Sequence, residues 1–176
     1  RVDAPDDLIL RRGLTAEEVS AVMIGATVRA ARRTGKVVFL DTDVGHVLAL
    51  RFGMTGVLEV DGSFGVEDLQ YSSNRHDPAW IRFSLHFEDG GVLALHDARR
   101  LGGIELDPDE SVLGIDATKI DSASLADALG ASTTPIKARL MDQARLAGLG
   151  NLLADEILWR AGLDPSRRCV ELASAE

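Results

Sequence analysis

The chain has 176 residues and a formal net charge of −9, with 45% hydrophobic and 27% charged residues. This length allows one good core or two small domains, and the composition is that of a globular protein without a disorder signature. The acidic net charge argues against a protein that binds polyanions through its overall field, so any such contact must be local. No apolar run is long enough to span a membrane and no signal-peptide pattern is present, so we expect a cytoplasmic protein.

Metal and disulfide chemistry have little support in the sequence. Cys169 is the only cysteine, which excludes an internal disulfide, fits a reducing compartment and cannot build a cysteine-rich zinc site. The four histidines show no spacing typical of metal ligands; they are His46, His76, His86 and His96. We therefore expect no metal and no cofactor.

The first predicted elements are a short strand and a helix. Residues 8–12 have the composition of a short strand. Thr15 and Glu18 form a capping-box pattern, which predicts that a helix begins there and ends at Gly25. The buried face of this helix is expected to carry Val19, Val22 and Met23.

Three β segments are predicted next. Residues 26–40 are rich in strand formers, with a bend or bulge expected at Gly35. Residues 46–52 predict a second strand, 53–56 a turn and 57–60 a third strand. These segments together favour an antiparallel meander.

A hairpin follows a long loop. Residues 61–79 are rich in Gly, Ser, Asp and Asn and are predicted to be a loop. Apolar and polar side chains then alternate over 81–87, which predicts a half-buried strand that turns back at 89–91 into a partner strand at 92–96. A further strand is expected over 102–106.

The composition changes from strand-like to helix-like between Asp107 and Asp121. We place a domain boundary there, with residues 1–116 in an antiparallel β-sandwich domain and 117–176 in a helical domain, so the predicted fold class is α+β. The first helix of the second domain is expected to begin at Ser122 or Ser124 and to continue through Leu129.

A helix, a tight turn and a second helix are predicted over 134–162. Thr134 is a suitable N-cap, and Pro135 suits the first helical position because its missing N–H would be unpaired in any case. The turn Gly148-Leu149-Gly150 allows positive φ or a close backbone approach, and Asn151 is expected to cap the second helix. The buried stripe of that helix is expected to consist of Leu152, Leu153, Ile157, Leu158 and Ala161, before Gly162 and Pro165 end it.

A glycine turn that opens on a helix directs free backbone N–H groups toward whatever lies beyond the helix start, which favours an anion such as a phosphate. An ordinary helical hairpin, whose glycines only allow close packing, explains the same residues. From this stretch alone the ordinary hairpin is the preferred interpretation.

Four segments, in order, resemble the bacterial formamidopyrimidine-DNA glycosylase and endonuclease VIII family. IKARLMDQARLAGLGNLLADEILWRAG resembles its helix-two-turn-helix segment, and GATVRAARRTGKVVFL its strand pair with a basic Lys. RFGMTG resembles the family's HLGMSG turn, and HDPAWIRFSLHFEDGGVLALHDARRLGG its hairpin ending in DPRRFG. The resemblance implies a β-sandwich domain, a hinge and a helix-two-turn-helix domain, with DNA bound between the two domains.

The resemblance also implies DNA-binding roles for individual residues. Lys36 and Asn151 match phosphate contacts, and Arg51 stands where the family usually has a phosphate-binding His. Met54 matches a wedge that enters the duplex, Arg99 matches a residue facing the orphaned base, and Leu101 stands at a common Phe wedge. His76 and Lys137 match further DNA contacts. Ordinary explanations exist as well: a core position for Met54, a structural role for His76 and a surface charge for Lys137. For Lys36 and Arg51, a solvated surface charge is the preferred explanation when the family is left aside.

The family's nucleophile is an N-terminal proline followed by glutamate, and Arg1-Val2-Asp3 is not that motif. The leading helix of the family and its C-terminal zinc finger also have no counterpart. Lys36, or the α-amine of Arg1, is a candidate amine, but no acid partner is evident nearby in sequence. We therefore expect this 176-residue chain to be inactive.

Three hypotheses follow. The first is a nucleoid-associated, damaged-DNA binding protein of the glycosylase type. Its partner is double-stranded DNA with a damaged base or abasic site, and its intact form removes the base and then cuts the abasic strand. The second is a non-catalytic binding module that keeps the DNA contacts. The third is an acidic protein-interaction derivative. Protein partners and lesion preference are not specified by the sequence.

Overall fold

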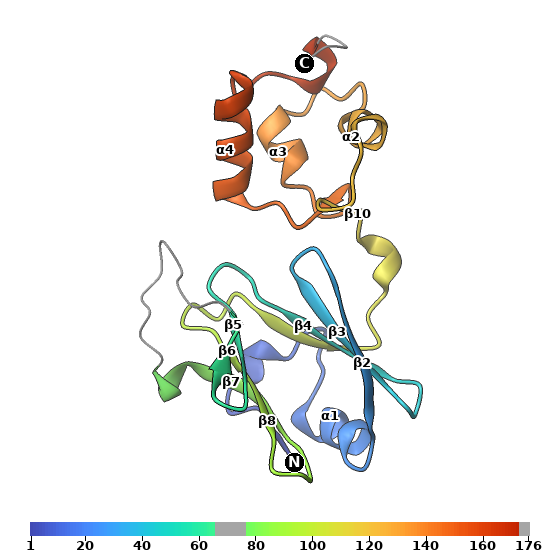
Figure 1. The fold of residues 1–176 in the computed structure, drawn as a ribbon, viewed down its shortest axis with the longest axis vertical. Helices are drawn as coiled ribbons and strands as arrows, with labels where there is room; N and C mark the ends of the chain where they lie inside the picture. Colours follow the sequence, from blue (N-terminus) through green and yellow to red (C-terminus); the bar gives the residue numbers. More distant parts are fainter. Residues whose placement is uncertain (66–76, 173–176) are drawn as a thin grey trace. The chain divides into compact units, whose positions relative to one another are not determined.

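The computed structural model describes residues 1–65 and 77–172 (Figure 1). Two compact units are present: the first is Arg1–Arg33 with Val37–Pro108, and the second is Thr34–Lys36 with Asp109–Glu176. His76 lies outside the described residues. No helix of the described residues is long and apolar enough to cross a membrane, and the same residues contain no group of three or more His, Cys, Asp or Glu that could hold a metal ion.

Two mainly antiparallel sheets form the first unit. One sheet has the strand order β1-β7-β8-β5-β6, and the other has the order β2-β3-β4-β9. The strands of the first sheet are β1 (Val2–Asp3), β7 (Ile81–His86), β8 (Val92–His96), β5 (Val57–Val60) and β6 (Ser63–Phe64). The strands of the second are β2 (Val28–Thr34), β3 (Val37–Thr42), β4 (Val47–Arg51) and β9 (Gly103–Leu106).

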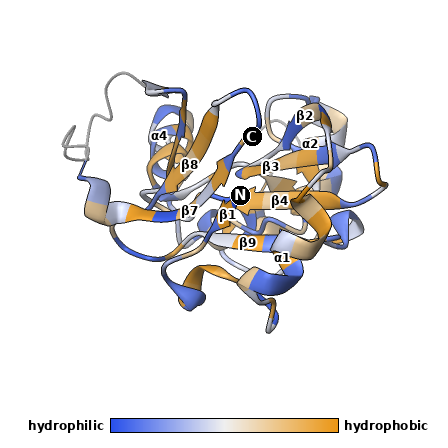
Figure 2. Cartoon of the chain, turned by 90° about the horizontal axis from the view of Figure 1, so that it is seen from below, coloured by the Kyte–Doolittle hydropathy of each residue, from blue (hydrophilic) through white to orange (hydrophobic). Residues whose placement is uncertain are grey.

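Both sheets contribute to one core. Leu48 and Leu50 of β4 are 0% exposed, as are Phe83 of β7 and Leu95 of β8, and all four belong to the same cluster of buried side chains. Figure 2 shows the hydrophobic residues concentrated on β3, β4 and β8. A shared core between two antiparallel sheets is the arrangement of a β-sandwich, so the predicted class of the first domain is confirmed.

The N-terminal helix α1 (Ala16–Met23) begins as the sequence predicts. The Oγ1 atom of Thr15 accepts from the Glu18 N–H at 3.2 Å, and the Glu18 carboxylate accepts from the Thr15 N–H at 2.8 Å. This reciprocal pair satisfies two amides that the helix itself cannot bond. Val19 is 0% exposed and anchors the helix in the core.

Two predictions for the first unit are wrong. Residues 8–12 form no strand, since the 3-10 turn η1 (Asp7–Ile9) precedes a single bridge from Leu10 to Ile104. The meander ends after β4, because β5 crosses to the other sheet and pairs with β8. A period of two predicts a strand and its buried face but does not specify which neighbour it pairs with.

The segment predicted as a loop over 61–79 contains short regular pieces. β6 pairs with β5, and the 3-10 turn η2 (Pro78–Trp80) leads into β7, with Asp77 accepting from the Ala79 N–H at 2.9 Å. The hairpin β7–β8 has the predicted turn, and its register shifts between Ile81 and Phe83.

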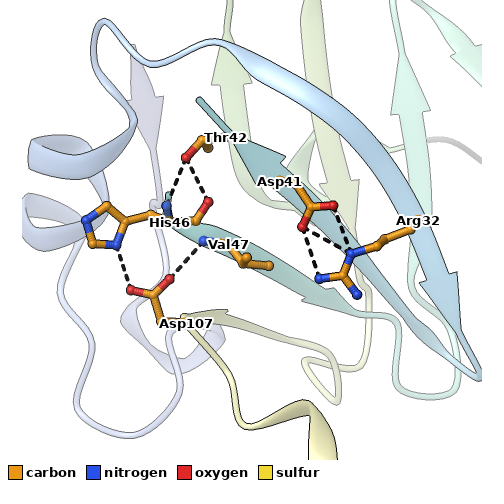
Figure 3. Close-up of polar contacts among 6 residues, drawn as sticks. All are labelled: Arg32, Asp41, Thr42, His46, Val47 and Asp107. Carbon is orange, nitrogen blue, oxygen red and sulfur yellow. Dashed lines mark hydrogen bonds and ion pairs between the residues drawn. The ribbon is translucent and has the colours of Figure 1, made fainter. Parts of the chain in front are cut away.

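A carboxylate joins β4 to the end of β9 (Figure 3). Asp107 accepts from His46 Nδ1 at 2.7 Å and from the Val47 N–H at 2.8 Å, while Thr42 Oγ1 donates to the His46 carbonyl at 2.7 Å. Partial burial raises the pKa of Asp107, but the hydrogen bonds from Val47 and His46, with the charge of His46, outweigh it and lower the pKa overall.

Several arginines of this unit are paired within the protein. Arg32 of β2 forms a forked contact with Asp41 of β3, with Nε donating at 2.9 Å, as Figure 3 shows. The same guanidinium lies 4.6 Å from the centroid of the Phe39 ring. These contacts hold β2 against β3. They also give the Arg32 guanidinium partners within the protein, which the sequence alone did not indicate.

The second unit is helical around its own core. Its elements are η3 (Glu110–Val112), β10 (Ile115–Asp116), α2 (Ser122–Leu129), α3 (Ile136–Leu140), β11 (Leu146–Ala147), α4 (Asn151–Ala161) and η4 (Cys169–Glu171). β10 and β11 form a short parallel pair. The core contains Ile136, Leu140, Ala154 and Leu158. Helix α2 begins at Ser122, and the Asp121 carboxylate caps it by accepting from the Ser124 N–H at 2.7 Å.

Both predicted caps of the helical pair are wrong. Pro135, not Thr134, precedes α3, and the first amides of α3 are bonded instead by the returning chain, with Ile136 N–H donating to the Arg167 carbonyl at 2.8 Å. Gly150 is the N-cap of α4, and no side chain caps this helix, so Asn151 is its first residue.

The predicted buried stripe of α4 is also wrong in most of its members. Leu152 is 55% exposed, Leu153 52% and Ile157 41%, whereas Leu158 is 2% exposed. Within the described residues, the core touches only the narrow face formed by Ala154 and Leu158. Gly162 ends the helix in the left-handed conformation, as predicted, with φ 66°.

Candidate nucleic-acid interface

The start of α4 is an anion-binding geometry in the second unit. Gly150 is the N-cap, with an extended backbone, and the Ala154 N–H donates to its carbonyl at 2.9 Å. The amides of residues 151–153 therefore have no acceptor within the helix. With 11 residues of aligned peptides behind them, these amides form the positive end of the helix.

Lys36 lies beside this helix start. Its Nζ donates to the Leu149 carbonyl at 3.0 Å, and a Cβ atom added to Gly150 would lie 2.5 Å from the same Nζ. The ammonium group thus occupies the space that any side chain at position 150 would need. Desolvation by partial burial lowers the pKa of Lys36 below its usual value. The Lys36 ammonium and the positive N-terminal end of α4 repel each other, and an anion bound between them relieves that repulsion.

A glutamine that the sequence pattern did not identify holds the turn before α4. Gln143 Nε2 donates to the Leu149 carbonyl at 2.8 Å and to the Met141 carbonyl at 2.9 Å, and its Oε1 accepts from the Gly148 N–H at 3.0 Å. All three bonds go to backbone within six residues. The signal that could have identified it is a Gln near the end of the first predicted helix, a few residues before a Gly-x-Gly turn.

The two glycines that face each other explain why Lys36 is held in place. Gly148 has φ 114°, and a Cβ added there would lie 3.3 Å from Gly35 Cα. The Gly35 N–H donates to Asp116 Oδ2 at 2.7 Å, and Asp116 is buried. Only glycine allows this approach, and the buried carboxylate fixes the turn that carries Lys36. Asp116 is a second positioning side chain that sequence reasoning missed.

Asn151 and Lys137 have different environments. Asn151 is exposed at the first position of α4, where its side chain makes no capping hydrogen bond. Lys137 of α3 is paired with Asp155 of α4, with Nζ 2.7 Å from the carboxylate. The structure therefore brings Lys36 and Asn151 to the helix start, whereas the charge of Lys137 is matched within the protein.

Met54, Arg99 and Leu101 belong to two adjoining loops of the first unit. Met54 is 71% exposed at the tip of the 53–56 turn, Leu101 is 49% exposed, and Arg99 is exposed. A Cβ added to Gly53 would lie 2.6 Å from the carbonyl carbon of Leu101, so the two loops touch through their backbones. Two exposed apolar side chains and one exposed cation thus lie on two adjoining loops. This combination suits insertion into a base stack and donation to a base edge.

Arg51 is committed to a partner inside the first unit. Its Nε lies 2.5 Å from Glu105 Oε1, and Glu105 is buried, with the Arg12 Nε at 3.8 Å from its other oxygen. Removing Arg51 from this carboxylate would leave a buried charge without its closest partner. A phosphate contact by Arg51 stays a prediction, and it has to use the guanidinium nitrogens that Glu105 does not engage.

Known proteins match both units. Residues 1–104 match the model of the formamidopyrimidine-DNA glycosylase N-terminal domain, and residues 113–176 match the formamidopyrimidine-DNA glycosylase H2TH domain. The formamidopyrimidine-DNA glycosylase of Cereibacter sphaeroides is 36% identical over 168 residues, which cover 88% of this chain and 57% of the relative. That of a Jannaschia species is 32% identical, covering 86% of this chain and 56% of the relative. The chain thus spans little more than half the length of these relatives.

The fold is also that of solved structures. A complex between the Lactococcus lactis Fpg and DNA containing an abasic site has a TM-score of 0.77 at 23% identity, covering 99% of this chain and 63% of that chain. A complex of inhibited Fpg with DNA containing N7-benzyl-Fapy-dG also has a TM-score of 0.77, covering 98% of this chain and 63% of that chain. The α+β class with a helix-two-turn-helix unit is therefore confirmed. With two family models that match its two units in order, this chain belongs to the formamidopyrimidine-DNA glycosylase family.

Proposed function

We propose that this chain binds double-stranded DNA at a damaged base or an abasic site, as a nucleoid-associated protein of the cytoplasm. Family membership supports a DNA repair role, and solved relatives are complexes with damaged or abasic-site DNA. The single observation that carries the proposal is the Lys36 ammonium held 3.0 Å from the Leu149 carbonyl, beside the open amides of α4.

A DNA phosphate is the anion that this helix start takes in our proposal. The phosphate accepts from the amides at the start of α4 and from Asn151, and the Lys36 ammonium neutralises its charge. A local site of this kind explains how a chain with net charge −9 binds a polyanion. The bond to Leu149 orients the Lys36 side chain before DNA arrives, which lowers the entropy cost of binding.

The two adjoining loops that carry Met54 and Arg99 with Leu101, here called the wedge loops, supply lesion recognition in this proposal. Met54 and Leu101 fill the gap left when a nucleotide leaves the stack, and Arg99 donates to the orphaned base. Unstacking costs least where pairing is already lost, so an abasic duplex binds more tightly than an undamaged one. Within the part of the chain that the structure describes, the Arg99 guanidinium has no ion pair, which leaves it available for this contact.

For the family's reaction, an unprotonated amine has to attack the sugar, and the candidate side chain is Lys36. Burial lowers its pKa, which favours the free amine. The Leu149 carbonyl and the proposed phosphate both favour the ammonium form instead. We therefore propose that Lys36 binds phosphate and does not attack the sugar. Borohydride treatment of the chain with abasic DNA should give no covalent adduct; an adduct that Lys36→Met abolishes would refute this assignment.

Binding is tested by fluorescence anisotropy with a duplex containing a tetrahydrofuran abasic analogue, over a series of salt concentrations. Lys36→Met should weaken binding and make the slope of log K against log salt shallower by about 0.9, the value for one phosphate contact. Asn151→Ala should weaken binding about threefold to tenfold, as expected for one hydrogen bond, with little change in slope. Lys119→Met removes an exposed lysine outside the site and serves as the control.

Two results would refute the phosphate site. One is salt-independent binding by the unmodified chain. The other is equal affinity of the Lys36→Met and Asn151→Ala variants and the unmodified chain. A loss of affinity in Lys119→Met equal to that in Lys36→Met would show a general charge effect in place of a local contact.

A further inference from the structure

Asp97 is a buried carboxylate that the proposed DNA contacts do not use. Its side chain is 0% exposed, which is unusual for an aspartate. Oδ1 accepts from Thr55 Oγ1 at 2.8 Å and from the Arg99 N–H at 3.1 Å, and Oδ2 accepts from the Gly102 N–H at 2.6 Å. One carboxylate therefore bonds the loop that carries Met54 and both ends of the loop that carries Arg99 and Leu101.

The backbone of Asp97 is fixed as well. Its N–H donates to the Trp80 carbonyl at 2.8 Å, and its carbonyl accepts from Arg82 Nε at 2.9 Å. Arg82 is mostly buried, so this contact is shielded from water. The carboxylate thus extends from an anchored position at the end of β8, and its direction is set by the sheet.

Close packing leaves the two loops little room to move independently. A Cβ added to Gly102 would lie 3.0 Å from Asp97 Oδ2 and 2.6 Å from the Arg51 carbonyl oxygen. Gly53 has φ +56° and faces the Leu101 carbonyl in the same way. The Thr55 hydroxyl is the side-chain donor that links the 53–56 turn to this carboxylate.

We propose that Asp97, through Thr55, is a positioning residue that holds Met54, Arg99 and Leu101 as one rigid wedge. This inference rests on the proposed function and identifies the device that prepares it. Ordering the wedge side chains on insertion costs conformational entropy, which reduces the binding free energy. A wedge that is already ordered avoids this cost and therefore binds a lesion more tightly. Undamaged duplex, which the wedge does not enter, gains nothing from this order.

The test uses Thr55→Val, which removes the hydroxyl at nearly constant volume, and Thr55→Ser, which retains it. Affinities are measured by anisotropy for the abasic-analogue duplex and for the matching undamaged duplex. Thr55→Val should lower the ratio of the two affinities about tenfold, the lower end of the range for one lost hydrogen bond to a charged group, while the affinity for undamaged DNA changes less than about twofold. Thr55→Ser should restore the ratio, and far-UV circular dichroism should confirm that each variant is folded.

A double-mutant cycle with Met54→Ala separates positioning from general stability. If Thr55 acts through the wedge, Thr55→Val should have little further effect on the affinity ratio once Met54 is truncated. Additive losses would overturn the inference. Asp97→Asn provides a second route, since an amide has one acceptor oxygen and so loses the contact with either the Gly102 N–H or the Arg99 N–H, and it should lower the ratio at least as much as Thr55→Val.

The outcomes distinguish this inference from the proposed function. If the unmodified chain prefers the abasic duplex and the Thr55→Val variant prefers it equally strongly, the positioning role is overturned and the proposed function is not. An unmodified chain that binds both duplexes equally overturns the proposed function, and the positioning role with it.

Discussion

Gly150→Ala tests the phosphate site by moving one group without removing any charge. The added Cβ would lie 2.5 Å from Lys36 Nζ and 3.4 Å from its Cε. Since non-bonded heavy atoms settle at about 3.5 Å, the ammonium has to move by about 1 Å. The backbone at 150 has φ −123° and ψ −176°, an extended conformation that alanine adopts without strain.

The expected loss is in binding and not in folding. A hydrogen bond to a charged group contributes about 1.5–3 kcal/mol, and a displaced ammonium keeps part of its attraction to the phosphate. We therefore expect a loss of about 1 kcal/mol, or about fivefold in affinity for the abasic-analogue duplex. Alanine is a poorer N-cap than glycine but restricts the unfolded chain, so the free energy of unfolding should change by less than about 1 kcal/mol.

The assay is anisotropy with the abasic-analogue duplex, with urea unfolding followed by circular dichroism. Gly65→Ala is the matched control, because a Cβ there would meet nothing within 4 Å among the residues that the structure describes. In a Lys36→Met background Gly150→Ala should have no further effect on affinity. Binding by Gly150→Ala at the level of the unmodified chain, or an undiminished loss in the Lys36→Met background, would refute the phosphate site at this helix start.

Three further predictions concern stability and are measured by urea unfolding. Leu95→Ala, at a core position that is 0% exposed, should cost about 2–5 kcal/mol, and a cost below about 1 kcal/mol would contradict a shared core. Thr15→Ala should cost about 1 kcal/mol through loss of the cap of α1, while Thr15→Ser should retain most of it. Because the folded pKa of Asp107 lies below its usual value of 3.8, its contribution is present above that pH and lost as pH falls through the folded pKa. Asp107→Asn should therefore make stability less dependent on pH in this acid range, and an unchanged acid dependence would contradict the assignment.

The hairpin β7–β8 shows what the sequence could predict. Alternation over 81–87 and a Gly-Gly turn specify two strands and their connection through local geometry alone. The crossing of β5 to the other sheet has no such local signal. Its partner β8 is more than thirty residues further along the chain, and only the shared core determines that pairing.

Helix α4 shows a different limit. Its apolar residues at 152, 153, 157 and 158 predict an amphipathic helix, and a helix forms there. The pattern does not say how much of the apolar face the core covers, and in the described residues the cover is narrow. The cap assignment failed because Gly150 and Asn151 are both good caps, and the Lys36 ammonium above residue 150 favours glycine there.

The candidate site divides in the same way. The resemblance identified Lys36, Met54, Arg99 and Asn151, which are exposed or partly buried side chains within recognisable motifs. It covered Asp97 within the hairpin segment but assigned it no role, because the contact of Asp97 with Thr55 spans 42 positions in sequence. Supporting contacts of this kind depend on tertiary structure, and no spacing rule reports them.

Under the proposed function, the pairing of arginines inside the protein affects how the chain searches DNA. Arg32, Arg51 and Arg100 each contact a carboxylate of the same chain, at 2.9, 2.5 and 2.9 Å. Among the described residues, fewer cations are then left to hold the duplex without regard to sequence or damage, and the excess of acidic groups repels misplaced encounters. Under the proposed DNA-binding function, we expect residence on intact DNA to be short, with sites sampled by frequent dissociation and hopping more than by long one-dimensional sliding.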